Sequence, residues 1–510
     1  MTLQLPRIEN PEIFIGFVGA IGVYFEPTLK MLRRLFEQEN YRVTEIKVTD
    51  LYKGFEPYVI PEQPLVRAPL YERFRSYIAY GNQLRRTFSD DAVLAAATIN
   101  RIVKKRPGGF EKNAFLLHQF KRREEIELLR SVYGHHFFQV SVYSRRGARV
   151  DSLARRFAAS ANSARDENFH EKAEQLVQID HDEVGVEHGQ RIGKIFHDAD
   201  FILNLDTQTP SLETQVKRFF DLLFSSNAYS PTRYEYGMFA AKAAAMRSLD
   251  LSRQVGAAVF SKGGDLVALG ANEVPQAGGD TYWPDGKFDA RDYKFGYDTN
   301  DRRKRQILSE IAEIICPYTG NEVVHENQRI LDSQFMDALE YGRVVHAEMC
   351  AICNAARAGH ALKNATLFCT TFPCHMCAKH IIAAGISKVV FLEPYPKSLA
   401  ANLHPDSLWI EHADRGEYSG YPAVEFEHFF GITPRRYLEF FQRSKRKDAN
   451  GNYQEYAHGI KRARLNVRSS YTHQRPNYFD LEQDILRLAL EEIKDTRILE
   501  EDIGDEHTSL

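Results

Sequence analysis

Two short stretches of the chain carry residue types that could do metal chemistry: His346 and Glu348, then Cys374 and Cys377. One imidazole and two thiolates give zinc three protein ligands and leave the fourth position open for water, whereas a structural zinc site is closed by four. Zinc acidifies its bound water, and a carboxylate close to it can move the released proton. The pattern predicts Zn²⁺ held by His346, Cys374 and Cys377, with Glu348 as acid and base of a hydrolytic reaction.

A closed zinc ribbon is the alternative interpretation of the cysteines. The spacing C-x2-C-x20-C-x2-C is close to that of a ribbon and involves Cys350, Cys353, Cys374 and Cys377. Ribbon cysteines lie in tight turns, whereas the sequence AEMCAICNAARAG around Cys350 and Cys353 strongly favours a helix. We therefore expect Cys350 and Cys353 to be small buried helix residues, and Cys316 and Cys369 to be core residues.

Size and composition limit the classes of protein that fit. The 510 residues, 43% of them hydrophobic and 26% charged, are enough for two or three globular domains. The longest apolar run, residues 13–25, is shorter than the roughly 20 residues of a membrane helix. The chain has only six cysteines, which argues against a disulfide scaffold and predicts a cytoplasmic location. A net charge of −3 gives no general attraction for long nucleic acids, so stable polynucleotide binding is not expected.

The zinc residues need a scaffold, and the residues from 231 onward predict an α/β domain. A helix at 239–248, strands at 256–260 and 266–270, and helices at 349–358 and 378–384 indicate an α/β/α sandwich. Pro373 suits a helix start, where the helix dipole favours the thiolate forms of Cys374 and Cys377. We place this domain at 231–445, with an insertion at 273–343, followed by a helical tail at 446–510.

Residues 1–230 have the pattern of a separate α/β domain with a parallel sheet. Strands are expected at 13–19, 42–48, 137–143 and 201–205, and helices at 26–38, 82–104 and 122–133. Gly16, Gly19 and Gly22 lie between the first strand and the first helix, where backbone N–H groups can face a phosphate. Val23 and Tyr24 occupy the positions at which a working P-loop has Lys and Ser or Thr, which argues against ATP hydrolysis.

Four arginines of this first domain are candidates for nucleotide sensing: Arg85, Arg86, Arg122 and Arg123. The alternative interpretation is a degenerate domain that is kept for assembly.

Residues 234–410 resemble the deoxycytidylate deaminase family in three stretches: RSLDLSRQVGAAVFSKGGDLVALGANEVP, HAEMCAICNAA and TTFPCHMCAKHIIAAGISKVVFLEPYPKS. The resemblance implies a cytidine-deaminase-like fold and zinc-dependent removal of the amine from a cytosine nucleotide. It places Asn272 against the sugar and Tyr395 near the pyrimidine, and we count Ala347 among the substrate contacts. The large insertion and the added first domain depart from the compact family.

The whole chain resembles bacterial two-domain deoxycytidylate deaminases of anti-phage defence, which carry an N-terminal P-loop nucleotide-kinase-like domain. This resemblance implies conversion of free dCTP or dCMP to deoxyuridine nucleotides plus ammonia, which drains the dCTP pool. It also implies a regulatory nucleotide at the first domain, and we expect a homo-oligomer. Two alternatives stay open: a deaminase of single-stranded DNA or RNA, and a nucleotide-controlled signalling or scaffold protein with an inactive deaminase half.

Overall fold

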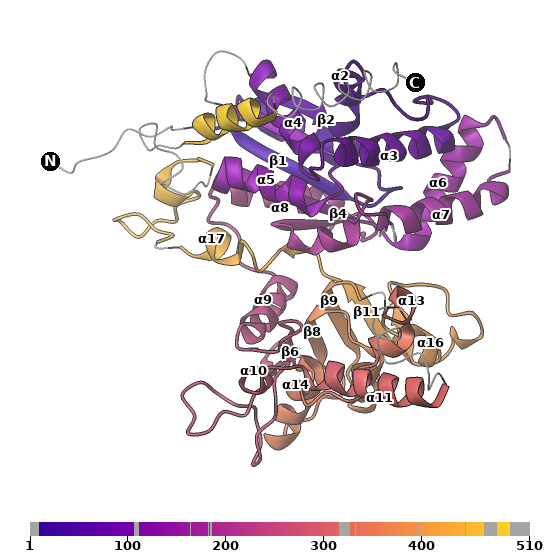
Figure 1. Ribbon diagram of the computed structural model, residues 1–510. Helices are drawn as coiled ribbons and strands as arrows, with labels where there is room; N and C mark the ends of the chain where they lie inside the picture. Colours follow the sequence, from indigo (N-terminus) through magenta and orange to yellow (C-terminus); the bar gives the residue numbers. More distant parts are fainter. Residues whose placement is uncertain are drawn as a thin grey trace. The chain divides into compact units, whose positions relative to one another are not determined.

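The chain divides into two compact units. The structure is a computed structural model that describes residues 10–106, 112–163, 165–181, 183, 186–315, 327–331, 333–395, 397–443, 445–463 and 477–489. Unit 1 comprises Met1–Ser230 together with Phe430–Leu510, and unit 2 comprises Pro231–Phe429 (Figure 1). Among the described residues, no helix is both long and apolar enough to span a bilayer.

Unit 1 is built on a six-stranded sheet in the order β12-β5-β4-β1-β3-β2. Strands β1 to β5 run parallel, and β12 pairs antiparallel with β5. Their side chains are largely buried because helices cover the sheet, as is usual for parallel sheets. The strands are β1 (Ile13–Gly19), β2 (Arg42–Lys47), β3 (Asn113–His118), β4 (Phe137–Tyr143), β5 (Phe201–Asn204) and β12 (Gly431–Ile432). The predicted parallel sheet is confirmed, whereas its likeness to P-loop enzymes stays a prediction.

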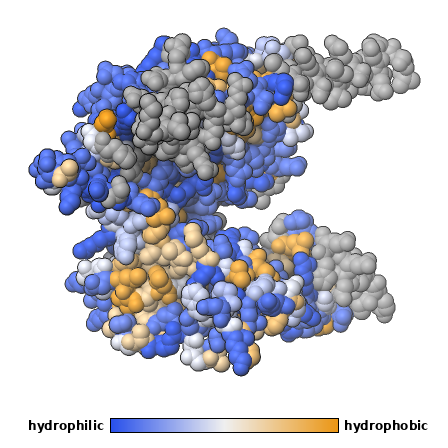
Figure 2. Space-filling view, turned by 90° about the vertical axis from the view of Figure 1, so that its left-hand side faces the viewer, coloured by the Kyte–Doolittle hydropathy of each residue, from blue (hydrophilic) through white to orange (hydrophobic). Residues whose placement is uncertain are grey.

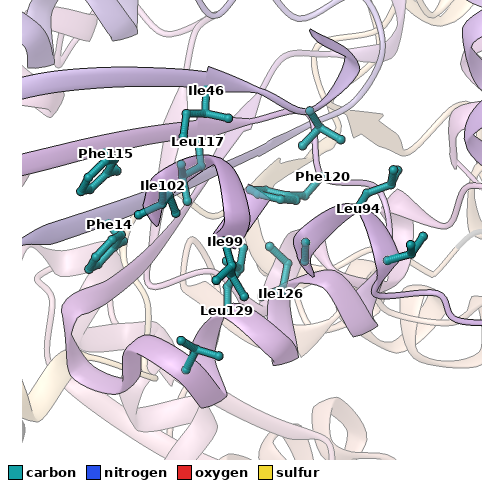
Figure 3. Close-up of a cluster of buried hydrophobic side chains, with 14 of the residues drawn as sticks. Phe14, Ile46, Leu94, Ile99, Ile102, Phe115, Leu117, Phe120, Ile126 and Leu129 are labelled. Atoms are coloured by element: carbon teal, nitrogen blue, oxygen red, sulfur yellow. The ribbon is translucent and has the colours of Figure 1, made fainter. Parts of the chain in front are cut away.

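The helices of unit 1 bury amphipathic faces against this sheet. One core joins Phe14 and Phe115 of the sheet to Ile99 and Ile102 of one helix and Leu129 of the next (Figure 3). The main helices are α1 (Glu26–Gln38), α3 (Leu70–Thr87), α4 (Val93–Lys105), α5 (Arg123–Tyr133), α6 (Arg146–Ser160), α7 (His170–His181) and α8 (Leu212–Leu223). The expected single helix at 82–104 is wrong, because α3 ends at Thr87 and Ser89 takes a left-handed φ of 48° before α4 begins.

The C-terminal segment returns to unit 1. Buried Asp200 accepts a hydrogen bond of 3.1 Å from Nε of Arg436, which directly precedes α17 (Tyr437–Phe441). Residues 478–489 are helical, and Tyr478 packs edge-on against Phe14. The division therefore differs from the expected domain at 231–445 and tail at 446–510, because pairing of β12 with β5 and the pair Asp200–Arg436 attach residues from 430 onward to unit 1.

Unit 2 is a three-layer α/β/α sandwich around a sheet in the order β10-β11-β9-β8-β6-β7. Strands β8, β9, β11 and β10 run parallel, and β6 pairs antiparallel with β7 and β8. A Cβ on Gly256 would lie 2.0 Å from the carbonyl oxygen of Ala241, and a Cβ on Gly270 2.1 Å from that of Ala347. Gly270 pairs with Ala257, the neighbour of Gly256, so the two glycines face opposite sides of the sheet and let a helix approach each side closely.

The strands of unit 2 are β6 (Gly256–Phe260), β7 (Leu266–Ala271), β8 (Thr366–Thr371), β9 (Lys388–Glu393), β10 (Leu408–Ile410) and β11 (Val424–His428). Its main helices are α9 (Arg233–Ala245), α11 (Thr299–Ile315), α14 (Ala347–Arg357) and α15 (His375–Ala383). Helix α9 covers the Gly256 side and α14 the Gly270 side. The expected sandwich is therefore present, and α14 and α15 carry the residues with metal chemistry.

Candidate active site

The three predicted metal ligands lie together at the starts of two helices. His346 directly precedes α14, Cys374 directly precedes α15, and Cys377 lies in the first turn of α15. The Nδ1 atom of His346 lies 3.2 Å from Sγ of Cys374 and 3.4 Å from Sγ of Cys377. Ligand atoms around one tetrahedral zinc are about 3.5 Å apart, given Zn–S and Zn–N bonds of about 2.3 and 2.0 Å. The donor set and its spacing therefore fit a zinc ion.

The electrostatics of the site favour an anionic sulfur. A hydrogen bond from Cys377, and then one from His346, lowers the pKa of the Cys374 thiol to about 4. The same contact with Cys374, followed by burial, raises the pKa of Cys377 well above its ordinary value. Zinc binds thiolates and neutral imidazole, so the ion takes the place of the protons that these groups share.

Glu348 lies next to the three metal-binding side chains but is not one of the predicted ligands. It is the second residue of α14, its side chain is 4% exposed, and the Cys377 thiol donates to its Oε2 over 3.4 Å. Burial, followed by the negative charge of Cys374, raises the pKa of its carboxyl group. A carboxyl group whose pKa is raised holds a proton more readily, which suits a group that must take up and return one in general acid–base catalysis.

A cavity of about 320 Å³ opens onto these residues. Its lining combines His346, Glu348 and Cys374 with the loop 250–255, with Tyr395, and with residues of the insertion. The charged side chains of the lining, apart from the metal site, are Asp250, Arg253, Asp292, Asp298, Asp337 and Lys397. Carboxylates thus outnumber cations around the mouth of the site.

Asn272, which the family resemblance assigns to the sugar, lines the cavity but already uses its amide. Its Oδ1 accepts the N–H of Val255 over 2.7 Å, and its Nδ2 donates to Asp250 Oδ2 over 3.0 Å and to the carbonyl of Arg253 over 2.7 Å. These bonds hold the loop 250–255 in place beside the metal residues. Ala347 and Tyr395 also line the cavity, and the contacts of all three with substrate stay predictions.

Sequence reasoning missed Arg253, whose guanidinium lies 5.5 Å from the centre of the Tyr395 ring and 3.6 Å from Glu393. Its side chain is 54% exposed and lines the cavity, so it is available to an anionic group. The only available signal was its place directly before the Gln254-Val255-Gly256 stretch. Lys397 was missed as well, and it is held by Asp337 over 2.6 Å.

The insertion reaches the cavity because it is anchored by a buried ion cluster. Arg291, 2% exposed, pairs with Asp289 over 2.8 Å and lies 3.6 Å from Glu273, two residues after the end of β7. Glu273 also accepts the N–H of Leu249 over 2.9 Å, which ties the insertion to the loop 250–255. Residues of the insertion such as Thr299 thus line the site.

The zinc-ribbon alternative is wrong. Among the described residues, the groups of metal-binding side chains within reach of one ion are His346, Cys374 and Cys377, and a second cluster of His412, Glu425 and Glu427. Cys350 and Cys369 are buried as expected, whereas Cys353 is exposed, and Cys316 lies outside the described residues. In the second cluster the ammonium of Lys388, 2.9 Å from Glu425 and 3.1 Å from Glu427, already supplies the positive charge.

The predicted nucleotide contacts of unit 1 are placed differently from expectation. Gly16 lies inside β1, where a Cβ would come within 2.5 Å of the Phe137 ring, and Gly19 ends the strand against Phe25. Gly22 lies in the turn with a left-handed φ of 93°. Packing and backbone conformation thus already require all three glycines, and their contact with a nucleotide stays a prediction.

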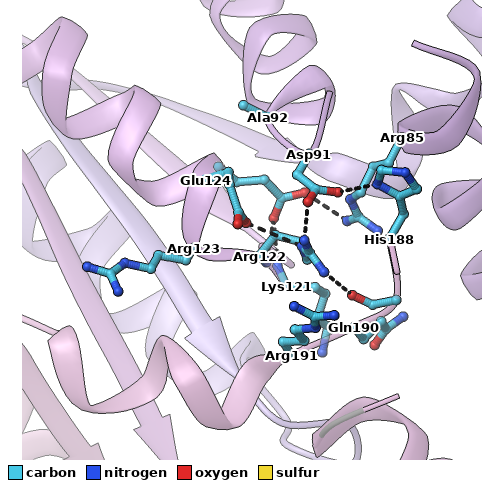
Figure 4. Close-up of polar contacts among 12 residues, drawn as sticks. Arg85, Asp91, Ala92, Lys121, Arg122, Arg123, Glu124, His188, Gln190 and Arg191 are labelled. Atoms are coloured by element: carbon cyan, nitrogen blue, oxygen red, sulfur yellow. Dashed lines mark hydrogen bonds and ion pairs between the residues drawn. The ribbon is translucent and has the colours of Figure 1, made fainter. Parts of the chain in front are cut away.

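The four arginines suggested for nucleotide sensing each have a carboxylate partner. Buried Arg122 pairs with Asp91 (Figure 4). Arg85 pairs with Glu125 over 2.8 Å, and Arg123 and Arg86 form exposed pairs with Glu127 and Glu62. A phosphate would have to compete with these carboxylates. Arg85 lines a cavity of about 170 Å³ in unit 1, and the other three arginines are not part of the lining of that cavity.

An α/β/α unit with an open three-ligand zinc site and a buried acid defines the class of unit 2 as a zinc-dependent hydrolase. Residues 231–393 match the family model of the cytidine and deoxycytidylate deaminase zinc-binding region. The deoxycytidylate deaminase of Enterobacteria phage T4 is 33% identical over 144 residues, which are 28% of this chain and 68% of that protein. The probable deoxycytidylate deaminase of Drosophila melanogaster is 31% identical over 201 residues, 38% of this chain and 78% of that one. The chain belongs to the deoxycytidylate deaminase family and is a zinc-dependent, hydrolytic cytosine deaminase.

A solved structure of a dCMP deaminase from the cyanophage S-TIM5, in complex with dCMP and dUMP, is also similar to part of the chain. It is 20% identical in sequence and covers 40% of this chain and all of its own, with a TM-score of 0.23.

Proposed function

We propose that the protein converts free deoxycytidine nucleotides, dCMP and dCTP, to deoxyuridine nucleotides and ammonia. The observation that carries the proposal is the cavity of about 320 Å³ in which Glu348 lies beside His346 and Cys374. The names of the relatives from phage T4 and Drosophila support a deoxycytidylate substrate.

The reaction adds water across C4 of cytosine and releases the amine. Bound zinc would be held by His346, Cys374 and Cys377, and it supplies a coordinated water of lowered pKa. Glu348 would take up one proton of the attacking water and deliver it to N3 of the ring. It would then take the second proton from the hydroxyl group formed on C4 and pass it to the amine, which leaves as ammonia as the C4 carbonyl forms. One water is consumed, and one ammonia and one uracil nucleotide are formed. The burial that raises the pKa of Glu348 suits a group that must both accept and return a proton.

The size and charge of the cavity favour a free nucleotide over a polynucleotide. Its volume lies near the lower end of the range of about 300–1,000 Å³ that is typical of small-molecule sites. Single-stranded nucleic acids need a basic groove that follows the backbone, whereas this lining carries four aspartates against Arg253 and Lys397. The loosely paired guanidinium of Arg253 is suited to contact the substrate phosphate, since Lys397 is held by Asp337.

In the cell this activity would lower the dCTP pool, in the manner of the anti-phage two-domain enzymes that the chain resembles. We also propose that the enzyme is a homo-oligomer. Strand β7 forms an edge of its sheet and exposes Leu266 and Leu269, and Figure 2 shows apolar side chains gathered on one face of unit 2. Sedimentation of wild type and Leu269→Asp tests this point, and a wild-type monomer would contradict it.

An ammonia-release assay with dCMP, dCDP, dCTP, CTP and single-stranded DNA tests the substrate. We expect turnover of the deoxycytidine nucleotides that falls sharply in Glu348→Gln and when Arg253 is replaced by Gln. Efficient deamination of single-stranded DNA, with dCMP and dCTP left unchanged, would show that the substrate assignment is wrong while the zinc chemistry stands.

A further inference from the structure

Unit 1 has a cavity of its own, which has a volume of about 170 Å³ and lies at the carboxyl ends of the central strands. Gly19 ends β1, Lys47 ends β2, and Gln119 follows β3, and all three line it. After β1 the chain forms β2 and β3 on one side of β1, and it then crosses to the other side of β1 to form β4. Ligands of open parallel sheets bind in the crevice at such a switch point.

The glycine turn at one wall of this cavity already holds an anion from the chain itself. The carboxylate of Asp180, fully buried in α7, accepts the backbone N–H of Ile21 over 2.6 Å and the ammonium of Lys121 over 2.5 Å. Lys121 also donates to the carbonyl of Gly19 over 3.1 Å. A phosphate at this turn would have to displace a buried, paired carboxylate, so the turn is a poor place for it.

The remaining walls of the cavity carry three cationic side chains that, unlike Lys121, are not paired with a carboxylate in the described part of the chain. Lys47 of β2, Arg73 of α3 and Arg156 of α6 line the cavity, and none of them has a carboxylate oxygen within 4.0 Å among the described residues. The guanidinium of Arg73 lies 5.2 Å from the centre of the Tyr77 ring. The guanidinium of Arg156 lies 6.0 Å from the centre of the Phe74 ring. The aromatic faces hold both guanidiniums without neutralising them.

The charges of these three side chains act on one another. Burial lowers the pKa of Lys47, the charges of Arg73 and Arg156 add to the lowering, and Asp50 and Glu45 act in the opposite direction. Burial, and then the charge of Arg73, lowers the pKa of Arg156. Three cations that repel one another around one cavity would be relieved by a bound anion.

The lining also contains buried polar atoms without a partner. Nε of Arg85 and Oε1 of Gln190 belong to side chains that are 3% and 6% exposed, and neither atom has a hydrogen-bond partner in the described part of the chain. Buried polar groups in proteins are nearly always paired, so unpaired ones in a cavity wall point to a ligand or water there.

We propose that this cavity binds the phosphoryl groups of a small phosphorylated compound through Lys47, Arg73 and Arg156, and not through the glycine turn. The volume is below the roughly 300 Å³ of sites that enclose a drug-sized ligand, so it suits phosphoryl groups alone. The same chemistry would serve a nucleotide, whose base and sugar lie outside the cavity, or a free di- or polyphosphate. The proposal does not depend on the substrate of unit 2.

Titration calorimetry of the full-length zinc-loaded protein with pyrophosphate and with ATP tests this site. We expect binding that weakens with salt, and an affinity at least about tenfold lower in Arg73→Gln, Lys47→Gln and Arg156→Gln. The matched controls are Arg75→Gln and Arg155→Gln, which remove exposed arginines of the same two helices that do not line the cavity. These controls should bind both probes within about twofold of wild type.

The two probes distinguish the sources of the phosphate. Tighter binding of ATP than of pyrophosphate, lost in the cavity variants, identifies a nucleotide site, and equal binding identifies a site for the free anion. Thermal unfolding of Arg156→Gln, the most exposed of the three positions, checks that the loss is not caused by misfolding. Binding of neither probe, or equal losses in the controls, would overturn the proposal.

Discussion

The Oε2 atom of Glu348 lies 3.4 Å from the sulfur of Cys377, although 29 positions separate the two residues in the chain. They meet because both lie in the first turn of a helix, α14 and α15, and the two helix starts face one cavity. The proton-transfer group and a metal ligand are therefore fixed by different helices, and their roles can be separated by mutation.

Glu348→Gln should keep about one zinc per chain and lose activity by at least about 10²-fold, because the amide keeps the shape of the side chain but cannot carry a proton. Metal analysis and ammonia release on the same sample give both quantities. Activity near that of wild type would contradict the assigned role.

Cys374→Ala should lose zinc and activity together, because two protein ligands hold the ion far less tightly than three. Cys353→Ala is the matched control, since this cysteine is exposed on α14 and lies outside the metal cluster. It should retain both zinc and turnover. Zinc content is the decisive measurement, and loss of zinc in both variants would favour a different ligand set.

Asn272→Ala should raise KM more than it lowers kcat. The substitution removes three hydrogen bonds that hold the loop 250–255, which carries Arg253 to the cavity. A looser loop weakens binding of the substrate phosphate but leaves Glu348 and the zinc ligands in place. Steady-state kinetics with dCMP give the two constants, and a change in kcat alone would speak against this role.

Arg291→Met should destabilise unit 2 by about 3 kcal/mol, because it leaves the buried carboxylate of Glu273 without its cation. The insertion lines the cavity, so KM should also rise. Arg303→Met, at a half-exposed position on α11, is the control and should change stability by less than about 0.5 kcal/mol. Urea unfolding followed by kinetics checks both effects, and equal stability losses in the two variants would refute the anchor.

Asp180→Ala should lower the stability of unit 1 by about 3 kcal/mol, since Lys121 and the N–H of Ile21 lose a buried partner. Asp151→Ala, whose side chain is 61% exposed, should have little effect. Thermal unfolding of both variants is the measurement. An unchanged midpoint in Asp180→Ala would mean that the carboxylate is not needed at the glycine turn.

Elements with strong local signals could be predicted from the sequence. The strand Ile13–Gly19 and the helix Glu26–Gln38 were predicted with their observed bounds, because an apolar run and a periodic amphipathic stretch follow each other directly. The three zinc ligands were also predicted together, because the spacing within each of the two motifs and the helix start at each motif are local features of the sequence.

Other features depend on contacts that are distant in the chain. Strand β3, Asn113–His118, lies between β1 and β2, and nothing local shows that a short apolar run there completes the sheet. Asp180 reaches the glycine turn from 159 positions away, so its occupation of the turn has no signal near Gly22. Arg253 lines the cavity on a loop whose backbone is bonded to Asn272, 19 positions further along the chain.

Because β12 pairs with β5, the sheet of unit 1 can be completed only after unit 2 has been synthesised. The ribosome completes the whole of unit 2 before Gly431, Ile432 and Arg436 emerge to join the sheet that residues 13–204 began. Until then the edge of β5 is unpaired, and buried Asp200 lacks its Arg436 partner. A nascent chain that stalls after unit 2 but before residue 431 would therefore contain a finished deaminase unit and, in unit 1, an unpaired sheet edge that is prone to aggregation.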